Sequence, residues 1–153
     1  MKPLRYVLLG ALFLLIMGAL FFAPKSSPKA PSAVLGGTSL RLLVATTTAA
    51  MEKGLGRRDS LPADEGMLFV FPKPDRYGFW MKDMRFPIDI IWLDAQGHVI
   101  TVAGSVATSS YPGVFYPSAP ATYVLETNAG FAASHNIATS TLVKLQNVPD
   151  ISE

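Results

Sequence analysis

Hydrophobic residues fall into short runs separated by turn-forming residues, a spacing that is typical of β-strands. Strands are predicted over 39–45, 66–71, 79–84, 88–93, 98–106, 122–126 and 141–146. Asp94 and Gly97 stand at the ends of a four-residue connection between two of these runs. Because Asp favours the first position of a turn and Gly the last, this segment predicts a β-hairpin.

Two short helices are predicted between the strands. The first begins at Thr46 or Thr47 and ends at the glycines 54 and 56, and the second is capped by Asn128. The strands lie too close together for βαβ crossovers, which need a dozen or more connecting residues. The predicted fold class is therefore mainly β, a small barrel or sandwich with two short helices.

The N-terminal segment has a different pattern, with no charged residue from Tyr6 to Pro24. Its length and hydrophobicity predict a transmembrane helix within residues 1–23. Lys2 and Arg5 precede it, which predicts a single-pass protein of the cell membrane with a cytoplasmic N-terminus. Phe21 occupies a position where a signal peptidase requires a small residue, so an uncleaved signal anchor is favoured over a cleaved signal peptide.

Composition divides the remaining chain into three parts. Residues 24–38 are rich in Pro, Ser and Gly and predict a tether, residues 39–148 form the globular β-rich domain, and residues 149–153 are a C-terminal tail. The sequence has no cysteine, so the exported domain is expected to fold without disulfides.

Charge and histidine content narrow the range of functions. The chain has 13 basic and 11 acidic residues, and leaving out Lys2 and Arg5 gives 11 of each. A neutral domain lacks the basic surface that nucleic-acid binding requires. The two histidines, His98 and His135, have no metal-ligand spacing. We therefore expect no metal, no cofactor and no nucleic-acid partner.

Four charged residues lie in or beside predicted strands that are hydrophobic on both faces: Lys82, Asp83, Asp89 and Glu126. A charge in such a strand is expected to be partly buried and to need a partner. The predicted pairing is Lys82 with Asp89 or Glu126. Ionic bracing of the core is favoured over binding of a polar ligand, and binding over acid–base catalysis.

The segment 108–121 contains three prolines and three aromatic residues and is predicted to be a long irregular loop. Its aromatic residues are Tyr111, Phe115 and Tyr116. Loops of this length in small domains are often functional, so the three side chains are candidates for one wall of a ligand or partner surface.

Residues 39–146 resemble the domain of unknown function 192 family of small prokaryotic proteins. The segments that carry the resemblance are Gly54–Arg57, Gly66–Phe71, Phe79–Asp83 with Pro87 and Asp89, Tyr123–Glu126, and Ala129 with Gly130. Gly56 replaces a Met of the family pattern, and Asp83 stands where Asn is usual. The resemblance implies a compact β-rich domain, often behind an N-terminal signal or anchor, and it leaves the activity open.

The leading functional hypothesis is a membrane-anchored extracytoplasmic module that binds a polar ligand or an envelope protein. The first alternative is a small envelope hydrolase or lyase that uses Lys82, Asp83, Asp89 and Glu126. A structural scaffold that assembles through the anchor is the second alternative.

Overall fold

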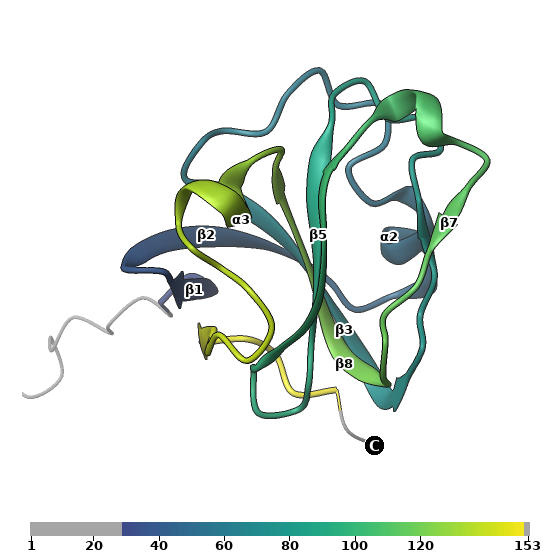
Figure 1. Ribbon diagram of the computed structural model, residues 1–153. Helices are drawn as coiled ribbons and strands as arrows, with labels where there is room; N and C mark the ends of the chain where they lie inside the picture. The colour runs from purple at the N-terminus through teal and green to yellow at the C-terminus, as the bar shows by residue number, and fades with distance from the viewer. Residues whose placement is uncertain (1–28, 152–153) are drawn as a thin grey trace, which may run out of the picture.

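The computed structural model describes residues 29–151, and the predicted anchor (1–23) lies outside this range. Its main element is a curled seven-stranded sheet (Figure 1). In spatial order its strands are β6 (Val99–Val106), β5 (Ile88–Leu93), β8 (Ala121–Asn128), β3 (Glu65–Asp75), β2 (Thr38–Ala45), β1 (Ser32–Leu35) and β9 (Lys144–Gln146). A separate two-stranded sheet consists of β4 (Phe79–Trp80) and β7 (Val114–Phe115).

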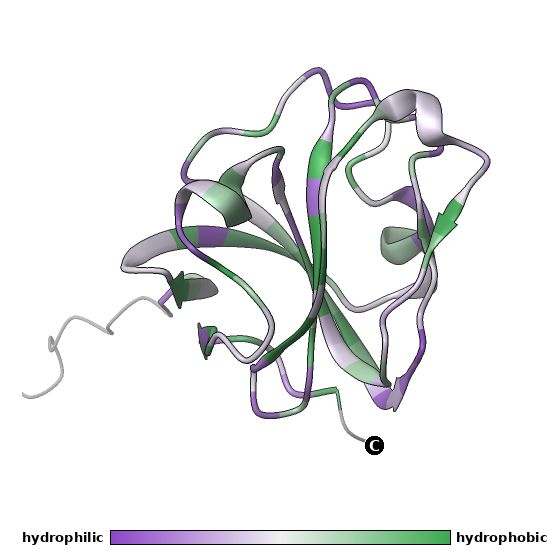
Figure 2. Ribbon diagram, viewed as in Figure 1, coloured by the Kyte–Doolittle hydropathy of each residue, from purple (hydrophilic) through white to green (hydrophobic). Residues whose placement is uncertain are grey.

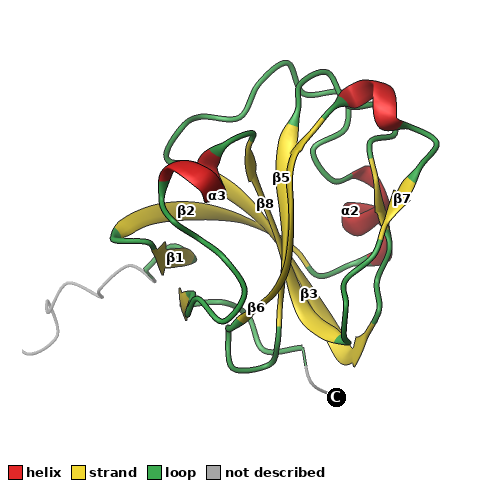
Figure 3. Ribbon diagram, viewed as in Figure 1, coloured by secondary structure: helices red, strands yellow, loops and turns green. Residues whose placement is uncertain are grey.

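The predicted mainly β class with two short helices is confirmed, and the large sheet forms a curled half-barrel. The helices are α2 (Thr48–Lys53) and α3 (Phe131–Ser134), and a single 3-10 turn, η1, spans Thr108–Ser110. Figure 3 shows α2 and α3 on opposite sides of the large sheet. Within residues 29–151, no helix has the length and hydrophobicity that crossing a membrane requires.

The sequence predicted the N-terminal cap correctly for α2 but not for α3. Thr47 caps α2 through its hydroxyl, and Gly54 ends that helix, as predicted. Asn128 does not cap α3, because Gly130 occupies that position. The amide of Asn128 instead donates a hydrogen bond to the carbonyl of Leu61 at 3.0 Å, which ties β8 to the loop before β3.

One strand pairing contradicts the expectation that the chain has no crossover connection. Strands β2 and β3 are adjacent and parallel, in register from Arg41 opposite Glu65 to Ala45 opposite Phe69. The connection over 46–64 contains α2 and is long enough to bring the chain back to the same end of the sheet. This crossover places α2 against one face of the sheet.

The boundaries of the globular domain also differ from those predicted. The tether was expected to extend to residue 38, but Ser32–Leu35 form β1, which pairs with both β2 and β9. Leu35 is buried because it packs into a hydrophobic core. Ile151, in the predicted tail, packs against the same core. Within the strand predicted over 79–84, only Phe79–Trp80 form a strand, and the chain then enters a turn.

Two hydrophobic cores lie on the two faces of the large sheet. The first lies beneath α3 and includes Leu68, Ile91 and Leu125. The second lies beneath α2 and β4 and includes Phe69 and Trp92. Alternation along each strand explains this division, since neighbouring residues point to opposite faces. Figure 2 accordingly shows β5 as largely hydrophobic along its length.

The predicted hairpin is present, with β5 and β6 antiparallel around the turn at 94–97. Oδ1 of Asp94 accepts hydrogen bonds from the backbone N–H groups of Gln96 and His98, at 2.9 and 2.8 Å. The start of β6 also bonds to the segment before β9, where the Val99 N–H donates to the carbonyl of Thr141 at 2.9 Å. This contact brings the two edges of the curled sheet close together around the first core.

Asp89 connects three segments on the α3 side of the sheet. Its side chain is fully buried. Oδ1 accepts backbone N–H groups from Ser105 at 2.6 Å and Gly130 at 2.9 Å, and Oδ2 accepts that of Ala132 at 2.7 Å. Asp89 therefore links β5 to β6 and to the start of α3 through backbone donors, and not through the ion pair that the sequence predicted.

We expect Asp89→Asn to lower the free energy of unfolding by roughly 2–4 kcal/mol. The amide retains one acceptor oxygen but turns an N–H group toward a backbone donor, which leaves a buried donor without an acceptor. Urea unfolding of the full chain measures the change.

Asp83→Asn is the matched control, because it makes the same chemical change at an exposed residue. Asp83 forms an ion pair with Arg57 in which both side chains are largely accessible to solvent. Its loss should cost less than about 1 kcal/mol. Equal effects of the two substitutions would contradict the bracing role of Asp89.

Candidate functional site

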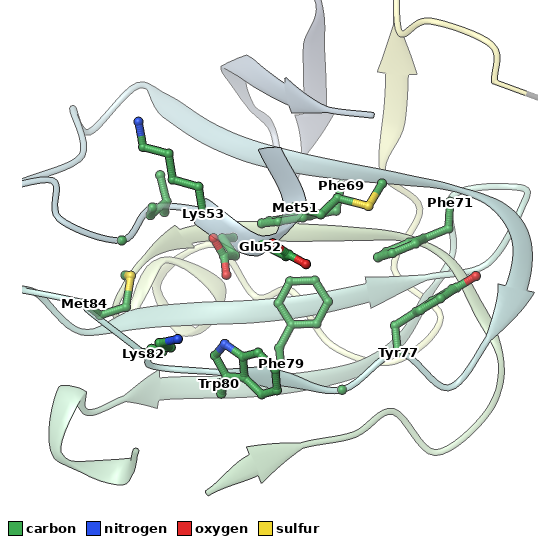
Figure 4. Close-up of a pocket in the computed structure, with 15 residues that line it drawn as sticks. Met51, Glu52, Lys53, Phe69, Phe71, Tyr77, Phe79, Trp80, Lys82 and Met84 are labelled. Atoms are coloured by element: carbon green, nitrogen blue, oxygen red, sulfur yellow. The ribbon is translucent and has the colours of Figure 1, made fainter. Parts of the chain in front are cut away.

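A cavity of about 190 Å³ opens on the α2 side of the sheet. Its walls are the end of α2, the turn over 54–56, strand β3, and the segment from Tyr77 to Met84 (Figure 4). The aromatic side chains that line it are Phe69, Phe71, Tyr77, Phe79 and Trp80. Met51 and Met84 add two flexible thioethers. The interior of this cavity is therefore largely apolar and aromatic.

The aromatic rings hold one another in fixed orientations. Phe79 packs edge-to-face on Phe69, with 4.8 Å between ring centroids, and approaches Trp92 in the same way at 6.0 Å. Phe71 and Tyr77 are stacked with centroids 3.6 Å apart. The indole Nε1 of the buried Trp92 donates a hydrogen bond to the carbonyl of Tyr77 at 2.9 Å. Because Trp92 is on β5, this hydrogen bond fixes the cavity wall at Tyr77 to the large sheet.

Glu126 is on a central strand of the large sheet, and its side chain lines the cavity. It is on β8, between Met67 of β3 and Ile90 of β5. Its exposed fraction is only 5%, yet it lines the cavity. Its Oε2 atom has no hydrogen-bond partner among the described residues. A buried carboxylate without a donor is costly, and such a group in a cavity is a candidate for ligand contact.

Burial raises the pKa of Glu126 from its ordinary value of 4.5 to about 8. The cause is desolvation, which disfavours the charged form of a carboxyl group. At neutral pH the carboxyl group is therefore mostly protonated. A side chain whose pKa lies near physiological pH can exchange a proton with a bound molecule.

Gly54 leaves room beside this carboxyl group. It ends α2 with a φ of +48°, a conformation that favours glycine. A Cβ atom at this position would lie 3.5 Å from Cζ of Phe69 and 3.9 Å from Oε2 of Glu126. The backbone at the end of α2 thus closes over the carboxyl group without filling the space in front of it.

Charged and polar groups surround the mouth of the cavity. Glu52 and Lys53 come from α2, and Lys82 comes from the turn after β4, and all three are exposed. In Figure 4 the amine of Lys53 points away from the aromatic side chains. Partial burial, and then the carboxylate of Asp75, raise the pKa of Tyr77, which therefore stays protonated at neutral pH.

The structure separates the four charged residues that the sequence grouped together. Lys82 and Glu126 line the same cavity. Asp89 lies on the opposite face of the sheet, and Asp83 is exposed and paired with Arg57 at 3.2 Å. The predicted pairing of Lys82 with Asp89 or Glu126 is wrong, because Lys82 follows the short β4 in a turn and lies at the surface.

The three candidate residues of the 108–121 loop do not line the cavity. Tyr111 and Tyr116 are exposed, and Phe115 packs against the second core. The loop supports the cavity wall from behind, since β7 pairs with β4. A Cβ atom on Gly78 would come within 2.7 Å of Val114 and 2.6 Å of Tyr116, so β4 and this loop are in close contact.

Sequence reasoning missed the aromatic and methionine lining of the cavity. One signal was present, because alternation in the run 66–71 places Phe69 and Phe71 on the same face. The positions of Tyr77, Phe79 and Trp80 next to this face depend on long-range packing. Among residues 29–151, no group of three His, Asp or Glu side chains is arranged to hold a metal ion.

Comparison with known proteins finds one matching family, and the solved structures similar to this chain include the following two. The family model described as Uncharacterized ACR, COG1430 (DUF192) matches residues 32–145. A protein of unknown function from Novosphingobium aromaticivorans DSM 12444 is 29% identical, with a TM-score of 0.68, covering 80% of this chain and 89% of that one. A protein described as a putative transcription regulator, from Sinorhizobium meliloti 1021, is 22% identical, with a TM-score of 0.71, covering 81% and 100%. No curated protein matches this chain.

The raised pKa of Glu126 makes a specific prediction about stability. Between pH 4.5 and about 8 the folded protein holds a proton that the unfolded chain releases. The free energy of unfolding of the wild type should therefore fall as the pH rises through this window, by a few kcal/mol in total (about 1.4 kcal/mol per unit). In Glu126→Gln this decline should be absent, so the variant gains stability relative to the wild type at pH 8.5.

Urea unfolding of the full chain at pH 5, 6.5 and 8.5 tests this prediction. Glu52→Gln is the control, because it makes the same change at an exposed position on the rim of the cavity, and its stability should run parallel to the wild type. A parallel curve for Glu126→Gln would show that the carboxyl group is solvated or paired in solution.

Proposed function

This chain belongs to the domain of unknown function 192 family, and we propose that its β domain is a binding module that takes a small molecule into the cavity beside Glu126. The observation that carries the proposal is the partnerless, buried carboxyl oxygen in an apolar, aromatic cavity. Ligand sites are typically concave and apolar, with a few polar groups that fix orientation. A ligand with a hydrogen-bond donor would satisfy Oε2 and cover the aromatic walls.

The cellular context is part of the same proposal. The charge-free run within residues 1–23, preceded by Lys2 and Arg5, supports anchoring in the cytoplasmic membrane with the β domain outside. The domain would then bind its ligand in the cell envelope, close to the membrane. Protease treatment of intact and of lysed spheroplasts tests the orientation, since an external domain is digested in both.

Acid–base catalysis is the second candidate, and the pKa of Glu126 favours it. A carboxyl group that titrates near pH 8 can act as a general acid at neutral pH, and Lys82 lines the same cavity. The arrangement retains only two of the four residues of the sequence-based enzyme hypothesis. Binding is favoured over catalysis because Lys82 is exposed at the rim, whereas Glu126 is the one buried ionisable group among the described residues that line the cavity.

A thermal-shift screen of small fragments against the full chain tests the binding function. We expect some fragments to raise the Tm of the wild type but not that of Met51→Trp. The larger indole should fill the cavity from α2 and exclude the ligand, while Met51 is only partly buried and its replacement should leave the fold intact.

Leu142→Trp is the matched control, since it adds the same side chain at an exposed position far from the cavity lining. It should keep every response of the wild type. Fragments that stabilise Met51→Trp equally well would place binding elsewhere and refute the assignment of this cavity. Turnover of any fragment that binds, followed by NMR, would favour catalysis.

A further inference from the structure

The size of the cavity limits what it can hold. Its volume is about 190 Å³, whereas a buried apolar cavity of roughly 150 Å³ accommodates benzene. The ligand portion that enters is therefore slightly larger than a six-membered ring. One ring or a short branched chain that carries a single polar group meets this limit.

The polar group of the ligand must be able to form a hydrogen bond with the carboxyl group of Glu126. Oε2 lacks a partner among the described residues and is itself shielded from solvent, and Glu126 is 5% exposed, so its carboxyl group can be reached only from the cavity that it lines. A carboxylate accepts hydrogen bonds, and its strongest partners are cationic N–H donors. Neither Lys53 nor Lys82, the two lysines that line the cavity, forms an ion pair with Glu126 in residues 29–151. The protein thus leaves the position of a cation open.

The aromatic walls favour a cation for a second, independent reason. The face of an aromatic ring attracts a positive charge, and the attraction is strongest for Trp and strengthens where water is excluded. Five aromatic residues line this cavity, of which Phe71 and Tyr77 stack on each other and Trp80 is half exposed. A neutral hydrogen-bond acceptor would satisfy a protonated Glu126 but would gain little from these rings.

We infer that the ligand is a protonated primary or secondary amine on a small apolar body, with its N–H group donating to the carboxyl group of Glu126 and its charge lying among the aromatic rings. This inference rests on the binding function proposed above and specifies its ligand class. The exposed charges of Lys53 and Lys82 oppose a cation, but they lie at the solvent-screened rim, where Glu52 offsets one of them.

Amine binding requires Glu126 to be ionised, so its proton passes to the buffer when the ammonium enters. Because burial raises the pKa of Glu126 to about 8, most of the molecules carry this proton at pH 7. The other titratable groups that line the cavity are Glu52, Lys53, Tyr77 and Lys82. Release of nearly one proton per bound amine at pH 7 is therefore a signature of Glu126.

Three probes of one shape test the inference by calorimetry on the full chain in nanodiscs of zwitterionic lipid. They are cyclohexylmethylamine, cyclohexylmethanol and cyclohexanecarboxylate. An alkylamine, like a lysine side chain with a pKa of about 10.4, stays protonated up to pH 9. We expect the amine to bind roughly tenfold or more tightly than the alcohol at pH 8, and its affinity to fall about tenfold per pH unit below pH 8.

Proton release is measured at pH 7 in two buffers that differ in ionisation enthalpy. The amine should release nearly one proton and the alcohol none. Glu126→Gln should lose the preference for the amine and its pH dependence, whereas Glu65→Gln, which makes the same change outside the cavity lining, should keep both. The proton count on the wild type does not depend on how any variant folds.

The outcomes separate the inference from the proposed function. If the alcohol or the carboxylate binds as tightly as the amine and Met51→Trp abolishes that binding, the amine assignment is overturned and the binding function stands. Amine binding without proton release, or binding that Glu126→Gln retains, also overturns it. If none of the three probes binds, the inference fails, and the fragment screen decides separately on the binding function.

Discussion

The central strands β5 and β8 are covered by hydrophobic core on both faces, and the rest of the structure depends on this coverage. All residues of β5 are buried. A polar side chain placed here cannot reach water and must find a partner within the protein. Two carboxyl groups lie on these adjacent strands, Asp89 on β5 and Glu126 on β8, and they point to opposite faces. Their surroundings explain most of the molecule's architecture.

On the α3 face, the carboxylate of Asp89 is fully satisfied by three backbone N–H groups. These groups come from β6 and from the start of α3, so a single side chain sets the path of two segments over the first core. Such charge-assisted hydrogen bonds contribute more than neutral ones. Asp89 itself is fully shielded from solvent, and the two sheet edges approach each other around the first core.

On the α2 face, Glu126 lacks such donors and the covering elements are small. Helix α2 has no fully buried residue, and β4 is only two residues long and is backed by β7. Short elements cover the sheet incompletely, and the space that remains is the cavity. The buried carboxyl oxygen without a hydrogen-bond partner among the described residues is the physical basis for proposing a ligand here.

Much of the fold was predictable from local pattern, because strands, turns and caps depend on residues close in sequence. The hairpin around Asp94 and Gly97 and the cap at Thr47 were predicted correctly. Strand β1 was missed because a four-residue strand in a proline-rich segment has little signal until β2 and β9 pair with it. The parallel pairing of β2 with β3 was missed for a similar reason, since it depends on where α2 packs.

The sequence by itself determined that this is a mainly β domain with charged residues in strands that are buried on both faces. It could not determine which charge meets which partner, because that depends on the order of strands in the sheet and on the side that each residue faces. Only the tertiary structure placed Asp89 among backbone donors and left Glu126 without one, one residue apart in register on neighbouring strands. Only long-range packing, likewise, gathered the aromatic residues of β3 and of the segment around β4 in front of that carboxyl group.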